Sequence, residues 1–121
     1  MAKEVAPERV QEPAGASHRD QKEDEEVRCL ACDHGVTRRS LRTERHGKHQ
    51  HAFLNPAGVP YTIALYSDAP GTVGHGDMES HFTWFPGHAW RIVLCARCQT
   101  HLGWSFHGEA AFFGLIVERM R

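Results

Sequence analysis

The sequence predicts a small all-β domain, and three observations carry this prediction. Short runs rich in β-branched and aromatic residues alternate with turns that contain Gly and Pro. No segment shows the three-to-four-residue apolar spacing of an amphipathic helix. Four cysteines form two C-x2-C pairs, which can cross-link a chain too short to build a large core. We therefore expect about six short antiparallel strands.

The strands are expected in chain order as follows. Residues 36–45 should hold one exposed edge strand and a turn, and further strands should cover residues 51–54, 59–66, 89–94, 103–107 and 111–119. Residues 55–58 (Asn-Pro-Ala-Gly) and 85–87 (Phe-Pro-Gly) carry turn chemistry. Residues 69–77 should form a long loop, and residues 82–85 should be extended. Along residues 89–94, the period of two places Trp90, Ile92 and Leu94 on one face.

The first 28 residues differ in composition from the rest of the chain. They carry eight acidic and five basic side chains and few large apolar ones, so residues 1–28 should be a disordered acidic tail. Residues 29–121 should then be the folded domain. A domain of this size has only a marginal hydrophobic core, so it should depend on another source of stability.

The cysteine pairs predict that source. Each C-x2-C turn presents two thiolates from one side, and two such turns fill the tetrahedral shell that structural zinc prefers. We expect one Zn²⁺ per chain, bound by Cys29, Cys32, Cys95 and Cys98, because no cysteine is left over. Such a site adds on the order of 10 kcal/mol to folding. Disulfides or free thiols are the alternative.

Composition also limits the compartment and the partners. The N-terminus has no apolar run of signal-peptide length, and no stretch approaches the length of a membrane span. Metal-spaced cysteines without a signal predict a reducing cytoplasm. Residues 29–121 hold nine Lys and Arg against seven Asp and Glu, without a basic block. We therefore expect neither a nucleic-acid partner nor a membrane partner.

Three tryptophans, Trp84, Trp90 and Trp104, lie within 21 residues. The plain interpretation is that they form core. However, a Pro-Gly turn between Trp84 and Trp90 can bring those indoles close together, and Trp104 shares a strand face with Phe106. These rings could instead form an aromatic box for a cation or for a flat neutral ring. No acidic residue lies between Trp84 and Trp104, which favours a neutral ligand.

Read together, these motifs resemble the CULT domain, the thalidomide-binding domain of cereblon. The resemblance runs from Cys29 to about Val117 and rests on Cys29-x2-Cys32, Asn55-Pro56-x-Gly58, the string Thr-Trp-Phe-Pro-Gly-His-Ala-Trp at 83–90, Cys95-x2-Cys98-x2-His101-Leu102-Gly103-Trp104-x-Phe106, and Phe-Phe-Gly-Leu at 112–115. The tryptophan string joined to the second cysteine pair is far more specific than either zinc knuckle alone.

The resemblance implies two antiparallel sheets that meet like a tent and are pinned by zinc. It also implies a three-tryptophan pocket for a glutarimide, succinimide or thalidomide-like ring. The imide would bond to backbone groups near Phe82 and Trp84. The implied ligand-binding residues are Asn55, Pro56, Phe82, Trp84, Trp90, Trp104 and Phe106. A free cyclic metabolite and a cyclised C-terminal imide of a damaged protein are both candidate ligands.

Two departures from the family pattern bear on function. This chain resembles the stand-alone single-domain members, because it shows no counterpart of the large domain that attaches cereblon to a ubiquitin ligase; no ubiquitin-ligase adaptor region is expected here. His88 also stands where the family often has tyrosine. It should lie beside the box and affect the pocket mouth or its pH dependence.

Competing functions are a methionine-sulfoxide reductase of the B type and a structural or nucleic-acid-binding zinc module. The first needs a nucleophilic cysteine beyond the four ligands, which the sequence lacks, so we expect no enzyme. In the second, the tryptophans would be ordinary core. The cluster His46, His49 and His51 should be an exposed loop rather than a second metal site. His101 should hydrogen-bond rather than bind the metal.

Overall fold

Strands dominate the computed structural model, which describes residues 24–121. They are β1 (Glu26–Arg28), β2 (Gly35–Arg38), β3 (Gln50–Leu54), β4 (Pro60–Tyr66), β5 (Thr72–Glu79), β6 (Ala89–Cys95), β7 (His101–His107) and β8 (Ala111–Ile116). The helices of the described part are two three-residue 3-10 turns, η1 (Arg39–Leu41) and η2 (Val117–Arg119). No helix in residues 24–121 is long and apolar enough to cross a membrane. The all-β prediction is confirmed.

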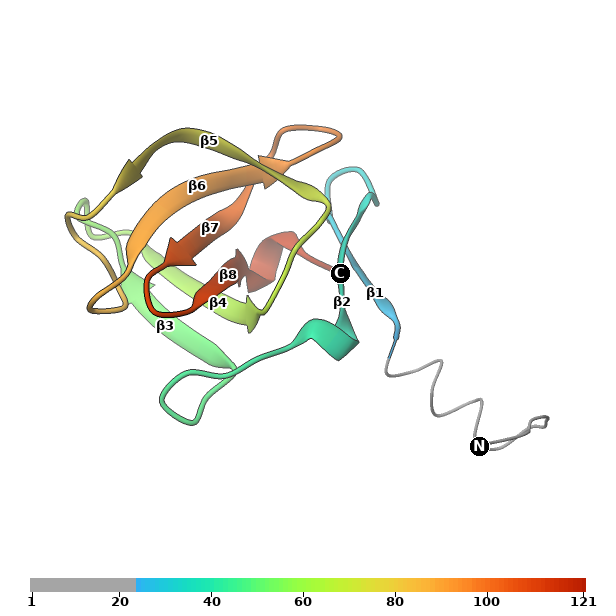
Figure 1. Ribbon diagram of the computed structural model, residues 1–121. Coiled ribbons are helices and arrows are strands. Elements are labelled where there is room, and N and C mark those ends of the chain that lie inside the picture. Colours follow the sequence, from blue (N-terminus) through green and yellow to red (C-terminus); the bar gives the residue numbers. More distant parts are fainter. Residues whose placement is uncertain (1–23) are drawn as a thin grey trace, which may run out of the picture.

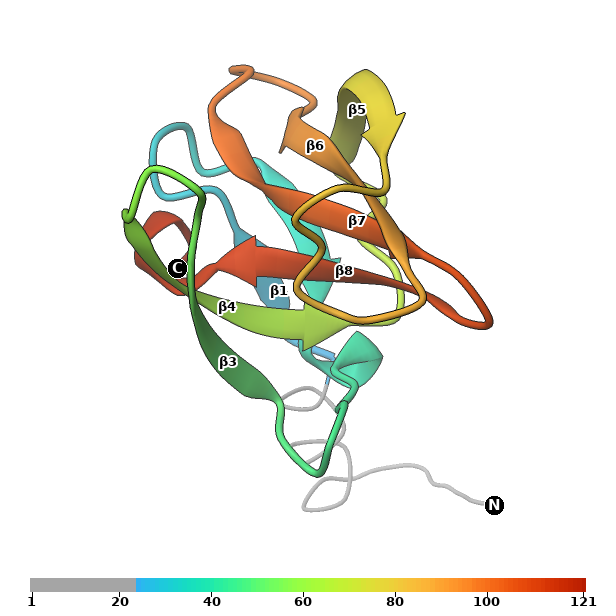
Figure 2. The ribbon, with the colours of Figure 1, turned by 90° about the vertical axis from the view of Figure 1, so that its left-hand side faces the viewer.

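The strands form two antiparallel sheets. Six of them follow the order β3-β4-β8-β7-β6-β5, and β1 pairs with β2 in a separate ribbon. Figures 1 and 2 show the six-stranded sheet strongly twisted and curved, with the β1–β2 ribbon beside it on the side of the C-terminus. The prediction of two antiparallel sheets is therefore confirmed, with a division into six strands and two.

Each face of the large sheet builds its own core. The period of two along β4 sends Ile63 and Leu65 to one face and Ala64 and Tyr66 to the other. The Ala64 face packs with residues of the β1–β2 ribbon and with three of the cysteines. The Ile63 face packs with the aromatic residues of β7 and of the segment that precedes β6. The functional candidates are therefore distributed over both faces.

The prediction of a loop at residues 69–77 is wrong, because most of these residues belong to the edge strand β5. This strand pairs with β6 from Thr72, opposite Cys95, to His75, opposite Ile92, and the register then shifts. Gly76 has a φ of 79°, which suits glycine and lets the chain bulge. The strand was not predicted because residues 69–77 are rich in glycine, which has a low strand propensity.

The connection from β5 to β6 also differs from expectation. Residues 82–85 are not extended, because Phe82 adopts a left-handed φ of 57°. The Pro-Gly turn that follows is confirmed: the N–H of His88 donates to the C=O of Phe85 at 3.0 Å, and Gly87 has a φ of 83°. Proline before a positive-φ glycine is the arrangement of a type II turn.

Three further boundaries are corrected. The strand expected as exposed within residues 36–45 is β2, but its Val36 and Thr37 are buried, and Val36 packs in the same core as Ala64. The last strand ends at Ile116, after which the chain forms η2. Of the expected tail, residues 1–23 lie outside the described residues. Residues 26–28 form β1, so the folded part begins before Cys29.

Candidate metal centre and aromatic pocket

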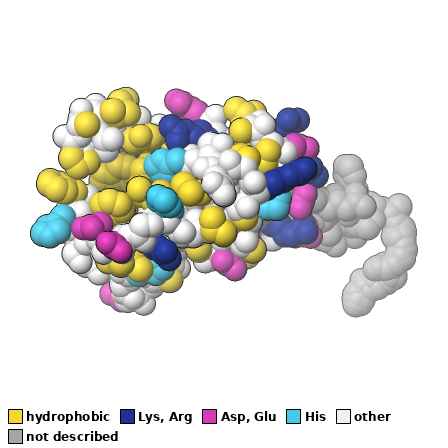
Figure 3. All heavy atoms as spheres, turned by 90° about the horizontal axis from the view of Figure 1, so that it is seen from above, with side chains coloured by type: hydrophobic (Ala, Val, Ile, Leu, Met, Phe, Trp, Pro, Cys, Tyr) yellow, Lys and Arg dark blue, Asp and Glu magenta, His cyan; other side chains and the backbone are white. Residues whose placement is uncertain are grey.

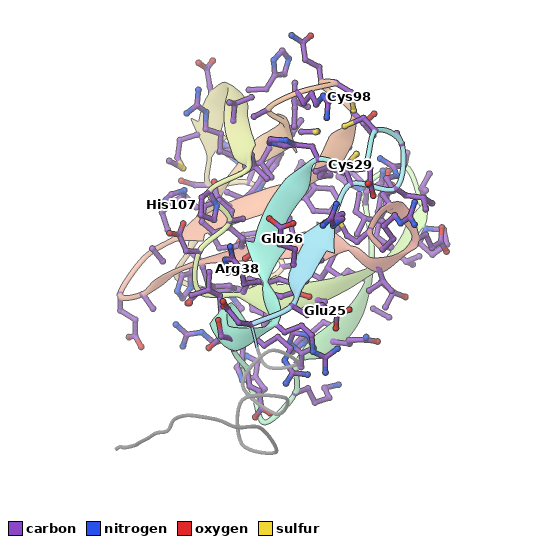
Figure 4. The ribbon with its side chains drawn as sticks, turned by 90° about the vertical axis from the view of Figure 1, so that its right-hand side faces the viewer. Glu25, Glu26, Cys29, Arg38, Cys98 and His107 are labelled. Atoms are coloured by element: carbon purple, nitrogen blue, oxygen red, sulfur yellow. The ribbon has the colours of Figure 1, made fainter. Side chains whose placement is uncertain are left out.

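The four cysteines come together at one end of the two sheets. Their sulfur atoms all lie within 4.8 Å of one another. The Sγ atoms of Cys29 and Cys98 are 3.7 Å apart, and those of Cys32 and Cys95 are 3.6 Å apart. A tetrahedral shell with Zn–S bonds of about 2.3 Å has edges of about 3.8 Å. Figure 4 shows Cys29 and Cys98 approaching from different elements. The four residues fit one tetrahedral metal ion.

The two knuckles have the same backbone geometry. The N–H of Asp33 donates to the C=O of Cys29 at 2.8 Å, and the N–H of Gln99 donates to the C=O of Cys95 at 2.9 Å. Both Asp33 and Gln99, each directly after a second cysteine, have a left-handed φ of 67° and 65°. The β1–β2 and β6–β7 turns therefore present their thiols in the same way, each from its own sheet.

The thiols differ in environment. Burial raises the pKa of Cys29 and raises that of Cys32 to about 12. The Thr100 hydroxyl lies 3.1 Å from Sγ of Cys98 and, with the Thr100 N–H, lowers the pKa of Cys98 to about 6. A bound cation would favour the deprotonated form of all four thiols in such a cluster. The donor set thus fits a metal ion with a preference for sulfur.

A separate cavity of about 230 Å³ lies on the Ile63 face of the large sheet. Its floor comes from β6 and β7, where Trp90 lies opposite Phe106 and Ile92 lies opposite Trp104. Its lining is Asn55, Pro56, Tyr61, Phe82, Trp84, Trp90, Ile92, His101, Trp104 and Phe106. Figure 3, at its left, shows hydrophobic side chains gathered at one end of the molecule.

Backbone hydrogen bonds fix two of the indoles. Nε1 of Trp84 donates to the C=O of Leu54 at 3.1 Å, and Nε1 of Trp90 donates to the C=O of His81 at 2.7 Å. The Trp84 ring also stacks on Phe53, with centroids 4.8 Å apart. Because the N–H of each indole is engaged by a backbone carbonyl, apolar ring surface is left for the cavity. Both rings line the same space.

All seven residues proposed as ligand-binding from the sequence line this one cavity. They are Asn55, Pro56, Phe82, Trp84, Trp90, Trp104 and Phe106. Their burial differs: Phe106 is 1% exposed and Trp104 is 8% exposed, whereas Phe82 is 73% exposed. Trp104 and Phe106 therefore belong to the core as well as to the cavity wall, and Phe82 lies at the rim.

The sequence did not single out Tyr61 or Ile92 as lining residues. Tyr61 begins the alternation on β4 that continues through Ile63 and Leu65, and its ring lies 5.2 Å from that of Trp104. Ile92 lies between Trp90 and Leu94 on the predicted common face of β6. Period-two alternation was the signal that could have identified both residues.

His101 also lines the cavity. Its Nε2 lies 3.0 Å from the C=O of Gly103, and its ring meets Trp104 edge to face at 4.8 Å. Since a carbonyl only accepts, Nε2 carries the proton. Burial lowers the pKa of His101, which favours the neutral ring. His101 is not among the clustered metal-ligand candidates, so the prediction that it hydrogen-bonds instead is confirmed.

Charge is scarce around the cavity. Among the described residues, its lining contains no Asp, Glu, Lys or Arg. A cation cage usually has a carboxylate close to its rings, and a site without charged groups favours a neutral ligand.

The histidine-rich segment is more ordered than expected. His51 is 7% exposed, and its Nε2 lies 3.1 Å from the C=O of Lys48, so the exposed-loop prediction is wrong for this residue. The Nδ1 of His49 lies 3.0 Å from the C=O of Thr43. Within residues 24–121, no group of three metal-ligand side chains forms at this segment.

His88 does not lie at the aromatic pocket. Its Nδ1 lies 3.2 Å from the C=O of Pro86, and its ring meets Phe112 edge to face at 5.4 Å. It lines a different cavity, together with Arg45 and Glu109. The expectation that His88 shapes the pocket mouth is therefore wrong, because the type II turn directs this side chain elsewhere.

Comparison with known proteins agrees with this architecture. The chain is 34% identical over 85 residues to the protein cereblon of Drosophila melanogaster and 35% identical over 85 residues to that of Drosophila simulans. The matched segment is therefore similar to part of cereblon. In both cases the match covers 64% of this chain and 14% of the relative, so the chain spans about one seventh of the length of these curated proteins. No protein-family model matches the chain.

The domain thus combines a four-cysteine cluster that can hold a metal ion with an aromatic cavity on the opposite face of the large sheet. Of the sequence-based predictions, the likeness to cereblon and the two-sheet fold are confirmed.

Proposed function

We propose that the aromatic pocket of this cereblon-like domain binds a small neutral cyclic imide, and that the four cysteines hold one structural Zn²⁺. The observation that carries the proposal is the pocket lining, in which three indoles surround a cavity free of charged side chains. When bound, the metal would supply a cross-link between the two sheets and no reaction step. The domain would therefore be a recognition module.

A cyclic imide matches both the walls and the backbone of this pocket. Its methylene groups can pack on indole faces, and its N–H lies between two carbonyl acceptors. Residues 82–84 can supply the complementary groups. Among the described residues, neither the C=O of Phe82 nor the N–H of Trp84 has a backbone hydrogen-bond partner.

Backbone strain at the rim supports the same interpretation. Phe82 holds a left-handed φ of 57° while 73% of its side chain is exposed. Such a conformation costs an aromatic residue on the order of 1 kcal/mol, and strained residues cluster at ligand sites. We propose that this turn orients the free C=O of Phe82 and the N–H of Trp84 toward the ligand.

The proposal excludes chemistry on the ligand. The only ionisable side chains that line the described pocket are Tyr61 and His101, and the His101 proton is engaged by a backbone carbonyl. All four cysteines belong to the sulfur cluster. We propose a free cyclic metabolite or the cyclised terminus of a damaged protein as the natural ligand. A cytoplasmic location, expected from the metal-like spacing of the cysteines, stays a prediction.

The test is a titration of glutarimide against tryptophan fluorescence, in parallel with N-methylglutarimide and a trimethyl-lysine peptide. Glutarimide should saturate the signal. The N-methyl compound should bind at least tenfold more weakly, because it loses the donor and leaves a backbone acceptor without a partner. Equal binding of the two imides, or tight binding of the ammonium peptide, would contradict the proposal.

A further inference from the structure

A second cavity, of about 360 Å³, lies beside the β1–β2 ribbon and shares no residue with the aromatic pocket. Its apolar surface comes from Val27, Ala64, Val117 and Met120. Its polar wall includes Arg39 and Arg42, at the start of η1 and directly after it, together with Tyr66 at the end of β4. One side of this cavity is therefore apolar and the other is cationic.

The cationic wall is built into the fold. Arg42 and Tyr66 face each other in an isolated antiparallel bridge, and the N–H of Thr43 donates to the C=O of Leu65 at 3.0 Å. Tyr66 is 7% exposed. Burial raises its pKa against the opposing influence of the Arg42 and Arg39 charges, so the phenol keeps its proton and can donate a hydrogen bond.

Within the described part of the chain, the guanidinium of Arg39 has one nitrogen without a hydrogen-bond acceptor. Its Nε is buried, and within residues 24–121 it meets no hydrogen-bond acceptor. In the same part of the chain, no ion pair joins Arg39 or Arg42 to a carboxylate. A buried donor of a charged group without an acceptor costs more than an ordinary unmade hydrogen bond. An anion bound beside this guanidinium would offset part of that cost through its charge.

The other charges at this cavity do not cancel those two arginines. Glu26 is engaged by Arg28, with 2.9 Å between Oε1 and Nη2. Arg121 approaches Asp33 at 3.6 Å. Glu25 is then the one acidic group of the described lining that remains to oppose Arg39 and Arg42. His49, the remaining titratable group of the wall, has its Nδ1 3.0 Å from the C=O of Thr43.

We propose that this cavity binds a small organic anion, a carboxylate or phosphate group carried on an apolar body. The anionic group accepts hydrogen bonds from Arg39, Arg42 and the Tyr66 hydroxyl, because guanidinium forks match the geometry of both oxyanions. The apolar body covers Val27 and Met120. This site is independent of imide binding, since the two cavities lie on opposite faces of the large sheet.

The test is calorimetric titration of the full-length, metal-loaded protein at constant ionic strength. Benzoate and phenyl phosphate should bind, whereas benzamide, which has the shape of benzoate without its charge, should not. Inorganic phosphate should bind at least tenfold more weakly than phenyl phosphate, because it lacks the apolar body. No saturable binding of either aromatic anion up to about 10 mM would overturn the proposal. Equal affinity for the two phosphates would overturn the role of the apolar wall.

Variants separate this site from a general charge effect. Arg39→Gln and Tyr66→Phe should each weaken benzoate binding at least fivefold. Arg38→Gln is the matched control: Arg38 precedes Arg39, lies outside the cavity lining and donates instead to the Asp24 carboxylate at 3.3 Å. Arg38→Gln should leave benzoate binding unchanged, and an equal loss in Arg38→Gln and Arg39→Gln would overturn the assignment.

Tyr66→Phe keeps the packing of the ring and removes only the hydroxyl, so this variant should fold. It therefore tests the proposal even if Arg39→Gln proves unstable. Thermal unfolding of each variant checks this. Full benzoate affinity in a folded Tyr66→Phe protein would remove the phenol from the site, and with it the proposal as stated.

Discussion

The indoles of Trp84 and Trp104 meet edge to face, with ring centroids 4.7 Å apart and ring planes at 71°. The two rings have different supports. Trp104 projects from the middle of β7 into the core, whereas Trp84 precedes a turn and is held through its indole N–H by the C=O of Leu54. One wall of the pocket is therefore part of the core, and the adjacent wall is attached to a loop.

The half-buried indoles of Trp84 and Trp90 should contribute to binding more than to folding. Trp84→Ala and Trp90→Ala should each weaken glutarimide binding by about 2 kcal/mol, the effect of removing a buried aromatic anchor. Both side chains are half-buried, so the proteins should still unfold cooperatively. Fluorescence titration of the remaining tryptophans and thermal unfolding measure the two effects. Unchanged affinity in both folded variants would count against the pocket.

The fully buried ring of Phe106 should contribute mainly to stability. Phe106→Ala should lower the free energy of unfolding by about 3 kcal/mol or more, because Phe106 is 1% exposed and packs on Phe85 and Phe112. Phe82→Ala is the matched control, since this ring lines the same pocket but is 73% exposed. Denaturant unfolding should separate the two variants clearly. Equal stability would show that the core assignment of Phe106 is wrong.

Loss of one thiol should unfold the domain. Cys95→Ser should abolish stoichiometric zinc binding and the cooperative thermal transition, because metal binding and folding are coupled in a site of this kind. Ala96→Ser is the control, since it places a hydroxyl on the adjacent, exposed position of the same knuckle. Metal content by elemental analysis and thermal unfolding give the result. A Cys95→Ser protein with one zinc ion and a normal transition would contradict the four-sulfur site.

Gly103 should be intolerant of any side chain. A Cβ at this position would collide with the backbone C=O of Gly114 on β8, which is not a flexible partner. Gly103→Ala should therefore destabilise the domain by about 2 kcal/mol or more. In Gly58→Ala the new Cβ meets open space. The free energy of unfolding should then fall by only about 1 kcal/mol, because alanine is strained at the positive φ of this position. Denaturant unfolding tests the order, and a reversed order would contradict the close β7–β8 approach.

His101 should make the domain less stable in mild acid. Burial lowers its pKa in the folded state below the ordinary value of 6.5, so the unfolded chain binds more protons in the window below pH 6.5. Stability from this group is therefore fully present above pH 6.5 and decreases as the pH falls towards the folded-state pKa. NMR titration of the ring should give a midpoint below 6.5, and a midpoint at or above this value would contradict the buried, neutral ring.

The matched variant for this prediction is His101→Gln. Its side-chain amide can donate to the C=O of Gly103 but does not titrate near neutral pH. Zinc release in acid affects both proteins equally, so the difference in their unfolding free energies isolates the imidazole. As the pH falls below 6.5, the free energy of unfolding should decrease more for the wild-type protein than for His101→Gln. A pH-independent difference would show that His101 is not perturbed.

Most of the strands could be anticipated because apolar alternation is a local property. The strands at residues 51–54, 59–66, 89–94 and 103–107 were expected within one or two residues of their observed bounds. The edge strand β5 was instead expected as a loop. Its pairing with β6 depends on a bulge at Gly76 and on the Arg91 side chain, whose Nε donates to the Gly76 C=O at 2.8 Å. Neither feature is visible in the propensities of residues 72–79.

Spacing and alternation along the chain were enough to establish the fold class, the four-cysteine set and the likeness to cereblon, because all three are local patterns of residues. The division of the aromatic rings into core and rim depended on tertiary packing, since burial is set by what lies against each face. Tertiary packing also brought Arg42 opposite Tyr66. Such a contact joins residues far apart in the sequence, so it depends on how the whole chain folds back on itself, which no local pattern encodes.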